Sequence, residues 1–327
     1  MNAVIPLPDM RNTITKDIAY CQELLRNNEL VAIPTETVYG LAANIYNDDA
    51  VRKIFEMKGR PLFNPLIVHI HHSDQLSSLA KSVPKAATKL AARFWPGPLT
   101  LILEKNTSVS DLVTAGKSTV AIRMPNHPLT LKLLQGLDFP VAAPSANPFT
   151  RVSSTSAQHV ADYFGNRIPA ILDGGPCTVG LESTIVGFDG ETVVVYRKGG
   201  ISIEAIEACV GKVRLFIKNE NAPQAPGMLA KHYSPRTKLI LSDNILKAME
   251  GFIDQKIGVL AFYESNFFNA KVVETLSEKR DLNEAAKNLF AALHRLDQES
   301  LDIIIAQRFP NEGLGISIND RLERAGN

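Results

Sequence analysis

Cysteine is scarce in this sequence, and long apolar runs are missing from it. The three cysteines, Cys21, Cys177 and Cys209, are widely spaced and form no CxxC pair, so neither a disulfide framework nor a cysteine zinc site is predicted. No apolar run approaches the ~20 residues that are needed to cross a bilayer. The opening segment, MNAVIPLPDMRN, carries an acid and prolines where a signal peptide needs an uninterrupted apolar stretch. We therefore expect a cytoplasmic protein without a membrane segment.

An excess of charge of either sign is also missing. The chain has 35 lysines and arginines against 34 aspartates and glutamates, which gives a formal net charge of +1. A protein that grips nucleic acid along a long face usually has a clearer basic excess, which weakens such a role for the whole chain. What is present is an ordinary globular composition, 45% hydrophobic and 21% charged, over 327 residues. That length favours two domains.

The first two-thirds of the chain alternates short apolar runs with helical spacing, which is typical of an α/β domain with a mixed sheet. The expected strands cover residues 30–34, 65–70, 99–103, 119–123, 139–143, 183–188 and 192–197. Helices are expected over 48–58 and 84–94. For the first helix, Asp48 or Asp49 is the expected N-cap and Gly59 the expected stop.

Residues 219–237 change the character of the sequence, with three prolines, one glycine and no periodicity. We interpret residues 213–237 as a linker between two domains. Further elements are expected beyond it, namely strands over 238–242, 256–263 and 301–307 and an amphipathic helix over 282–296. The sequence thus predicts one domain over residues 1–212 and a smaller, Rossmann-like α/β domain over 238–327.

Two loops carry groups that suit a ligand. Residues 34–41, PTETVYGL, follow an expected strand and offer threonine hydroxyls and the carboxylate of Glu36 where open α/β sheets bind ligands. A turn whose hydroxyls satisfy its own backbone is the alternative. Residues 58–65 place Lys58 and Arg60 around a glycine, a point charge and a planar fork that suit a nucleotide triphosphate. The alternative is that these cations only complement the dipole of the preceding helix.

An arginine interrupts the apolar strand that is expected over 119–123. Alternation places Thr119, Ala121 and Arg123 on one face of this strand. A buried arginine is costly unless an anion meets it. The carboxylate of a ligand and a structural glutamate both remain open as its partner.

Three further segments carry groups that could bind a ligand or a metal ion. Ser145 and Asn147 present small donors after a strand, as phosphate or ribose binding requires, although a plain turn is the simpler interpretation. The glycine-rich residues 173–184 allow close approach of a ligand but lack the lysine of a P-loop and the GxGxxG order. His69 and His71 would share a strand face, yet no third or fourth ligand accompanies them, so hydrogen-bonded histidines are expected rather than metal ligands.

Taken in order, these segments resemble one family. The threonylcarbamoyl-AMP synthase family, also called YrdC/TsaC, closely resembles this chain over about residues 15–210, in PTETVYGL, KGRPLFNPLIVHI, FWPGPLTLIL, AIRMPNHP, APSAN and LESTIV. Its hallmark pairs a Lys-x-Arg with a later Ser-x-Asn, here Lys58/Arg60 and Ser145/Asn147. The segments PGMLAKHYSP and GLGISINDRLERAG resemble the linker and the C-terminal domain of the longer, two-domain form.

The resemblance implies both a fold and a reaction. The fold would be a YrdC-type twisted mixed sheet around a large concave cleft. The enzyme would be a nucleotidyltransferase that forms threonylcarbamoyl-AMP and pyrophosphate from L-threonine, bicarbonate and ATP, with Mg²⁺ whose ligands stay unassigned. Its product would feed the threonylcarbamoyladenosine modification of tRNA through a separate transferase complex, and direct contact with tRNA is not required.

The resemblance also implies roles for residues by their position. The residues implied for L-threonine are Thr37, His69, Arg123, Ala143 and Ser183. The residues implied for ATP are Lys58, Arg60, Asn64, Thr119, Ser145, Asn147, Ser153 and Arg197. Lys58 and Arg60 are also the expected catalytic residues, and Asn147 is the weakest candidate. The linker residues expected to form a lid are Pro226, Gly227, His232 and Tyr233.

The sequence also allows two alternatives to the synthase function. An RNA-binding module with a basic cleft is disfavoured by the net charge near zero. A carbamoyl-transferring maturation enzyme is disfavoured because no segment looks like an acylphosphatase or a zinc finger.

Overall fold

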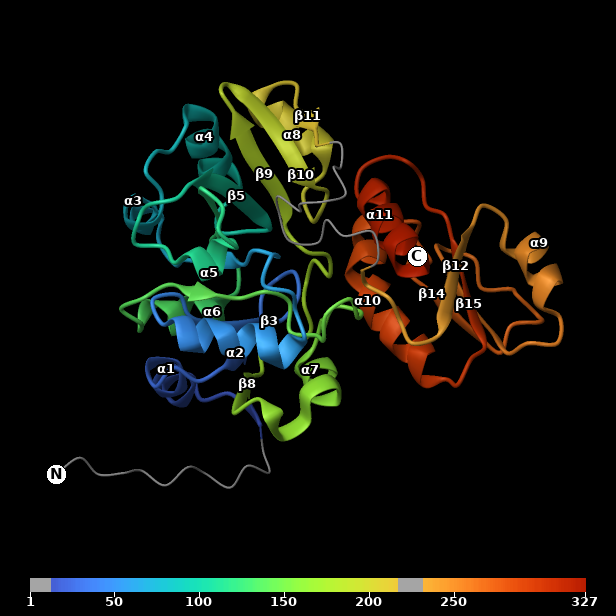
Figure 1. The fold of residues 1–327 in the computed structure, drawn as a ribbon. Helices are drawn as coiled ribbons and strands as arrows, with labels where there is room; N and C mark the ends of the chain where they lie inside the picture. Colours follow the sequence, from blue (N-terminus) through green and yellow to red (C-terminus); the bar gives the residue numbers. More distant parts are fainter. Residues whose placement is uncertain (1–12, 217–231) are drawn as a thin grey trace.

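The computed structural model of the chain describes residues 13–216 and 232–327. In the first of these parts a single sheet of 11 strands has the order β1-β8-β2-β3-β7-β4-β6-β5-β9-β10-β11 (Figure 1). Its strands are β1 Ile14–Thr15, β2 Val31–Ile33, β3 Gly40–Asn44, β4 Ile67–His69, β5 Leu99–Glu104, β6 Thr119–Arg123, β7 Val141–Ala142, β8 Ala170–Leu172, β9 Thr184–Asp189, β10 Thr192–Arg197 and β11 Arg214–Leu215. Parallel and antiparallel pairs alternate irregularly, which confirms the mixed sheet.

The helices of this part join the strands and cover the sheet. They are α1 Ile18–Arg26, α2 Asp48–Lys58, α3 Leu76–Leu79, α4 Lys85–Phe94, α5 Asp111–Thr114, α6 Pro128–Gln135, α7 Ala157–Phe164 and α8 Ile203–Val210, with short 3₁₀ turns at Ser73–Gln75 and Gly165–Arg167. The expected N-cap of α2 was wrong. Asn47, not Asp48 or Asp49, has the extended backbone of a cap, and its side chain accepts a hydrogen bond from the N–H of Ala50.

Each strand expected in the first domain is present, and β1, β3, β8 and β11 are additional. β3, with the sequence GLAAN, has no β-branched side chain, so propensity does not reveal it. It forms because its backbone pairs antiparallel with β2, as in the register of Val31 with Ala42. β1 and β11 contain two residues each and lie at the two edges of the sheet.

The large sheet divides the side chains of its strands between two faces. One face packs against α2, α4, α7 and α8 and forms the main hydrophobic core, to which β6 contributes Val120 and Ile122. On the other face, α1 and α6 cover the region around β2 and β8. Over β4, β5, β6 and β9 the same face carries a small apolar patch that includes Ala121. The alternation expected for 119–123 is therefore confirmed.

The C-terminal part is a smaller α/β unit with a four-stranded parallel sheet. Its elements are β12 Lys238–Ser242, α9 Ile245–Met249, a 3₁₀ turn at Glu250–Phe252, β13 Ile257–Ala261, β14 Val272–Thr275, α10 Leu282–Gln298, β15 Ile303–Gln307 and α11 Gly315–Gly326. The strand order is β12-β15-β13-β14, with α10 and α11 on one face and α9 on the other. Helices on both faces of a parallel sheet are the Rossmann-like arrangement that the sequence predicted. No helix among the described residues combines the length and the apolarity that crossing a membrane requires.

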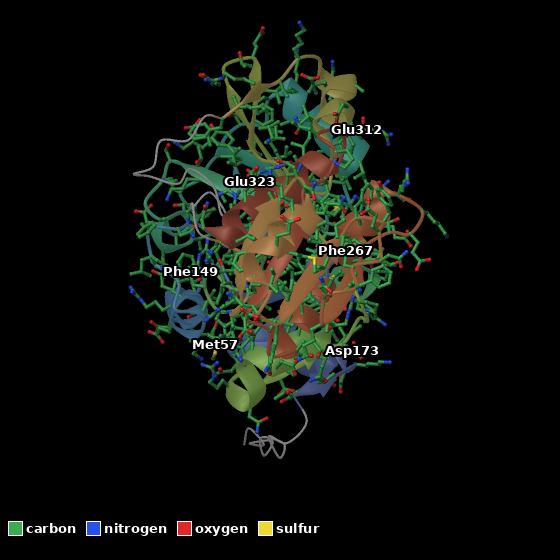
Figure 2. All side chains as sticks on the ribbon, turned by 90° about the vertical axis from the view of Figure 1, so that its right-hand side faces the viewer. Met57, Phe149, Asp173, Phe267, Glu312 and Glu323 are labelled. Carbon is green, nitrogen blue, oxygen red and sulfur yellow. The ribbon has the colours of Figure 1, made fainter. Side chains whose placement is uncertain are left out.

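The two parts of the chain share a hydrophobic core. Val38, Val152 and Leu181 of the first part belong to the same cluster as the buried side chains of α10 and α11. Figure 2 views the molecule from the side of this C-terminal part, which lies in front of the first. The backbones also meet closely, because a Cβ added to Gly180, at φ +74°, would lie 2.5 Å from the Cα of Lys287 in α10. Only glycine fits this contact.

Candidate functional site

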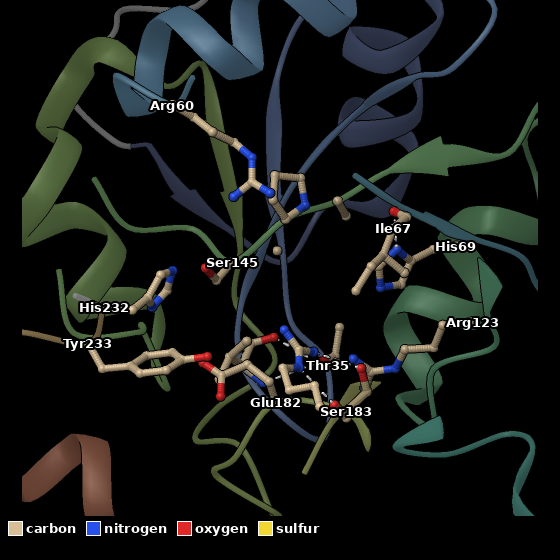
Figure 3. A pocket seen from close by; sticks show the side chains of 15 residues that line it. Thr35, Arg60, Ile67, His69, Arg123, Ser145, Glu182, Ser183, His232 and Tyr233 are labelled. Atoms are coloured by element: carbon tan, nitrogen blue, oxygen red, sulfur yellow. Dashed lines mark hydrogen bonds between the residues drawn. The ribbon is translucent and has the colours of Figure 1, made fainter. Parts of the chain in front are cut away.

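A pocket lies on the face of the large sheet that is opposite the main core, where the parallel strands β4 and β6 end (Figure 3). It encloses about 560 Å³, counting space that is open to solvent. His69 at the end of β4 and Arg123 at the end of β6 line one side. Arg60, His232 and Tyr233 line the opposite side. The carboxyl ends of parallel strands are where open α/β sheets bind ligands.

The cation-bearing loop begins at the end of α2. Gly59 adopts φ +61° as the C-cap, so the chain turns sharply between Lys58 and Arg60 and directs both side chains inward. The ammonium of Lys58 donates hydrogen bonds to the carbonyl of Ser145, at 2.5 Å, and to the carbonyl of Asn147. The Lys-x-Arg and the Ser-x-Asn segments are therefore in direct contact, although they are far apart in the sequence.

Arg60 is held by the backbone of its own loop. Its Nε donates to the carbonyl of Asn64 at 3.1 Å and its Nη2 to that of Pro65 at 2.7 Å. Arg60 is 7% exposed and Lys58 is 3% exposed, and within the described residues neither has a carboxylate partner. Two buried cations without a counter-charge are unfavourable unless a ligand supplies it.

The pKa values report the same crowding of positive charge. Burial, and then the charge of Arg60, hold the pKa of the Lys58 ammonium well below its ordinary range. Burial, and then the charge of Arg197, lower the pKa of Arg60 to about 9. A polyanion bound in the pocket would raise both pKa values again, because an opposite charge favours the protonated form. This side of the pocket is therefore built for a strongly anionic group.

Arg123 has one of the two partners that the sequence left open and retains a donor for the other. Its Nη2 donates to Oε1 of Glu36 at 2.7 Å, and Oε2 of Glu36 accepts from the N–H of Asn126 at 2.9 Å. The structural glutamate is thus present. The Nε of Arg123 is buried and has no hydrogen-bond partner among the described residues, and the side chain lines the pocket. One edge of the guanidinium remains available to a ligand carboxylate.

His69 lies beside Arg123 in the register of β4 and β6. Burial, and then the charge of Arg123, lower the pKa of His69 to about 3, so its ring is neutral at neutral pH. Its Nδ1 lies 3.1 Å from the carbonyl oxygen of Ile67 and donates to it in the neutral ring. Nε2 is then a hydrogen-bond acceptor.

Arg197 and Ser183 form the floor between these two sides. Arg197 donates from Nε to the carbonyl of Ser183 and from Nη2 to its Oγ, both at 3.1 Å. The Oγ of Ser183 also lies 2.7 Å from that of Thr100 on β5. Next to Ser183, the carboxylate of Glu182 faces the pocket and is bound by Ser153 and Arg321.

The structure brings most of the predicted site residues to this pocket. Those that line it are Arg60, His69, Arg123, Ala143, Ser145, Ser183, Arg197, His232 and Tyr233. Those that lie behind the lining are Thr37, Lys58, Asn64, Asn147 and Ser153. Thr119 lies in a neighbouring hollow with Ile102 and Tyr196. Pro226 and Gly227 lie outside the described residues.

Buried amides point to a missing partner in the same region. The side chain of Asn64 is fully buried, and neither its oxygen nor its nitrogen has a hydrogen-bond partner in the described part of the chain. The Oδ1 of Asn147 is in the same state, although its Nδ2 donates to two carbonyls. Buried polar groups without partners are rare and costly, so a polar ligand is the simplest explanation for them.

Comparisons with known proteins agree with this geometry. A Sua5/YciO/YrdC family model described as "Telomere recombination" matches residues 23–199, and one described as "Threonylcarbamoyl-AMP synthase, C-terminal domain" matches residues 201–327. The chain belongs to the threonylcarbamoyl-AMP synthase family. The resemblance seen in the motifs, including the two-domain form, is confirmed.

Individual members of the family match over nearly their whole length. The threonylcarbamoyl-AMP synthase of Bacillus subtilis is 43% identical over 98% of this chain and 96% of its own length. That of Pyrococcus abyssi is 42% identical over 92% and 91%. The crystal structure of P. abyssi Sua5 complexed with L-threonine superimposes with a TM-score of 0.89, at 41% identity and 94% coverage of each chain. The YrdC-type fold is confirmed by this match.

Sequence reasoning missed Glu182 and Arg321 as residues of the site. Arg321 did leave a signal, because it lies on the apolar face of α11 with Ile318, Leu322 and Ala325. A charged residue on such a face needs a buried partner. The partner itself could not be found from the sequence, since Glu182 is 139 residues away along the chain.

Proposed function

We propose that the chain is an L-threonylcarbamoyladenylate synthase, which joins carboxylated L-threonine to AMP. The observation that carries the proposal is one pocket with two chemically different sides. Lys58 and Arg60 supply buried positive charge on one side, with no carboxylate partner in the part of the chain that the structure describes. Arg123 and His69 supply a free guanidinium edge and a neutral acceptor on the other. A triphosphate suits the first side and an amino acid suits the second.

The bond-making step follows from bringing these two substrates together. Carboxylation of the neutral threonine amine by bicarbonate gives a carbamate and releases water; the proton of the ammonium form leaves beforehand. A carbamate oxygen then attacks the α-phosphorus of ATP, the bond from this phosphorus to the α,β-bridging oxygen breaks, and pyrophosphate leaves. The residues of the pocket contribute positioning and charge stabilisation at phosphorus, so no protein nucleophile is needed.

Release of pyrophosphate tests the proposal directly. The full-length chain is assayed with ATP and Mg²⁺, and L-threonine and bicarbonate are each omitted in turn. We expect release only when both are present, with threonylcarbamoyl-AMP as the second product by mass spectrometry. Release that does not depend on threonine would contradict the proposal.

Mg²⁺ is proposed to enter with the nucleotide rather than to reside in the protein. No group of three His, Cys, Asp or Glu side chains in the described residues could hold a metal ion. Glu182, which lines the pocket, and Glu36, which pairs with the pocket residue Arg123, are each bound to an arginine. The donor set therefore does not fit a protein-held Mg²⁺, whose usual ligands in such enzymes are carboxylates and substrate phosphates.

The linker is proposed to act as a lid over the pocket. Its C-terminal residues His232 and Tyr233 support this role, because both are buried and line the pocket. The N–H of His232 donates to the carbonyl of Arg324, and that of Ser234 to the carbonyl of Thr150, so the segment is anchored on both domains. Closure of a lid excludes water from the reaction.

The remaining partners belong to the same proposal. Threonylcarbamoyl-AMP is a mixed anhydride that hydrolyses unless a second enzyme uses it, so we propose a separate tRNA threonylcarbamoyl transferase complex as its consumer and the cytoplasm as the compartment. The RNA-binding module is not favoured. The cations of the pocket are buried, whereas a protein that binds RNA presents its cations to the phosphate backbone.

A further inference from the structure

A carboxylate lies inside the most positive part of the pocket. Glu182 is 5% exposed and lines the pocket together with Arg60 and Arg197. A negative charge at this place has two unfavourable effects on an anionic ligand. It repels the ligand, and it attracts the same guanidinium groups that the ligand needs. The contacts of Glu182 therefore matter for the nucleotide side of the pocket.

Both oxygens of Glu182 are bound from outside the pocket. Oε1 accepts a hydrogen bond from the Oγ of Ser153 at 2.6 Å. Oε2 accepts one from Nε of Arg321 at 2.9 Å. Arg321 belongs to α11 of the C-terminal domain and is fully buried. The counter-charge of an active-site carboxylate thus comes from the other domain.

The two Nη atoms of the Arg321 guanidinium are also hydrogen-bonded. Nη2 donates to the carbonyl of Lys198 and Nη1 to a carboxylate oxygen of Asp320, both at 2.9 Å. The guanidinium carbon lies 5.1 Å from the centre of the Tyr233 ring. Arg321 therefore contacts the carboxylate, the strand end after β10 and the lid residue at once, and its orientation is determined by all three.

We propose that Arg321 is a positioning residue for the nucleotide site, which neutralises Glu182 and so leaves Arg60 and Arg197 to bind the triphosphate. Without Arg321, the buried carboxylate would lose its main counter-charge and would pair more closely with the guanidinium groups of the pocket. Phosphate groups would then compete with Glu182 for the same cations. The inference rests on the proposed function, because it takes the anion to be ATP.

Docking of the two domains does not by itself require this ion pair. Ser317 of α11 donates to the carbonyl of Gly199, and His294 of α10 lies 3.1 Å from the carbonyl of Ser153. The shared apolar cluster of the two domains adds to these contacts. An ionised arginine is thus not needed merely to hold α11 in place, which gives its charge a separate role.

Binding of inorganic pyrophosphate to full-length variants tests the proposal. Calorimetry measures the Kd of pyrophosphate, and kinetics measure KM for ATP and for L-threonine. We expect Arg321→Met to weaken pyrophosphate binding and to raise KM for ATP by about tenfold or more, with KM for threonine within about twofold of wild type. Adding Glu182→Gln to Arg321→Met should restore pyrophosphate binding to within about twofold of wild type, because a neutral amide no longer competes.

Arg308→Met is the matched control. Arg308 also pairs with a residue of α11, Glu323, but it is exposed and lies outside the pocket, so its loss should not change pyrophosphate binding. Wild-type binding by Arg321→Met would overturn the proposal, and so would a double variant as weak as the single one. Thermal unfolding checks that each variant is folded.

The double variant keeps the test decisive if Arg321→Met does not fold. It removes both charges of the Glu182–Arg321 pair together, and it must then bind pyrophosphate within about twofold of wild type, whereas binding about tenfold weaker overturns the proposal. A wild-type chain without threonine-dependent pyrophosphate release would refute the proposed function instead. The comparison of pyrophosphate affinities remains valid in that case, so the two failures are distinguishable.

Discussion

Lys58 and Arg60 are similar to each other in what surrounds them. Both are buried, and both bind backbone carbonyls rather than carboxylates. We expect Lys58→Ala and Arg60→Ala each to lower turnover by about 10²–10³-fold, the usual cost of losing one preorganised group that stabilises charge. Steady-state pyrophosphate release measures this. Lys53→Ala removes a half-buried lysine of the same helix, α2, that does not line the pocket, and should leave the rate unchanged.

The side of the pocket near His69 is small and partly apolar. Ile67 and Ala143 line it, which suits the methyl group of threonine. We expect threonine to exceed serine in kcat/KM by about 10–200-fold, because a single methylene in an apolar pocket supplies no more discrimination than that. Competition between the two amino acids in the pyrophosphate assay measures the ratio. Equal kcat/KM values would mean that no methyl pocket exists.

At the scale of residues, the sequence indicated which side chains could bind a ligand better than it indicated which side chains contact one another. The Lys-x-Arg and Ser-x-Asn segments were ambiguous one by one, and only their order along the chain, through the family resemblance, assigned them to the site. For Arg123 the sequence left two partners open, and the structure contains one of them, Glu36, while leaving an edge of the guanidinium free. The contact of Glu182 with Arg321 joins residues that are 139 positions apart, which no local pattern encodes.

Helices α7 and α10 meet through two stacked histidine rings. His159 and His294 lie 3.9 Å apart between ring centres. Burial, and then the charge of His294, lower the pKa of His159 to about 3, and burial lowers that of His294. The unfolded chain, with ordinary histidine pKa values near 6.5, therefore binds protons that the folded chain does not. The stability that this difference in proton binding contributes is fully present above about pH 6.5. It is lost as the pH falls towards 3, the pKa of His159 in the folded chain.

Replacement of one ring tests this dependence on pH. We expect His159→Phe to keep the stacking and to remove about 1.4 kcal/mol per pH unit from the acid slope of the free energy of unfolding between about pH 5.5 and 3.5. Urea denaturation at several pH values measures the slope. His72→Asn, at an exposed histidine that caps a 3₁₀ turn, should not change it. An unchanged slope in His159→Phe would show that the ring titrates normally.

The linker is the element in which the proposed lid resides. Replacement of residues 217–231 by a glycine–serine segment of equal length keeps the domains connected and removes any specific closure. We expect kcat to fall about 10-fold or more, because the site would no longer exclude water. A matched variant, His232→Ala with Tyr233→Ala, tests the two proposed lid residues that the structure describes, both of which line the pocket. Full threonine-dependent activity in both variants would exclude the lid.

At the scale of elements, periodicity and apolar content predicted the helices α2, α4 and α10 and the central strands. The strand β3 escaped because its small residues carry no strand signal. The helix α11 escaped because its first residues, GIS, have modest helix propensity, and burial against the first domain stabilises it instead. Both misses arise where tertiary pairing, rather than local preference, determines the backbone.

At the scale of the whole molecule, the two domains meet at a glycine with no room for a side chain. A Cβ on Gly180 would lie 2.5 Å from the Cα of Lys287, so Gly180→Ala should push α10 away. We expect it to lower the free energy of unfolding by about 1–3 kcal/mol, the usual cost of overpacking, and to weaken binding of pyrophosphate. Denaturant unfolding measures the first effect and calorimetry the second.

Gly190→Ala provides the control for backbone strain. Gly190 also has a positive φ, +59°, but nothing lies within 4 Å of its added Cβ. It should therefore share the conformational cost of Gly180→Ala without the collision. If the two variants have the same stability and the same affinity for pyrophosphate, the close contact between the domains has no functional consequence.

Lys58 and Arg60, which have no carboxylate partner in the described part of the chain, also have a practical consequence for purification of the chain. A buried pocket with this positive potential binds small multivalent anions from the solution. Sulfate, citrate or phosphate in a buffer would bind on the nucleotide side of the pocket, compete with ATP and lower the measured rate. Chloride or acetate solutions of matched ionic strength would leave the space to the substrate.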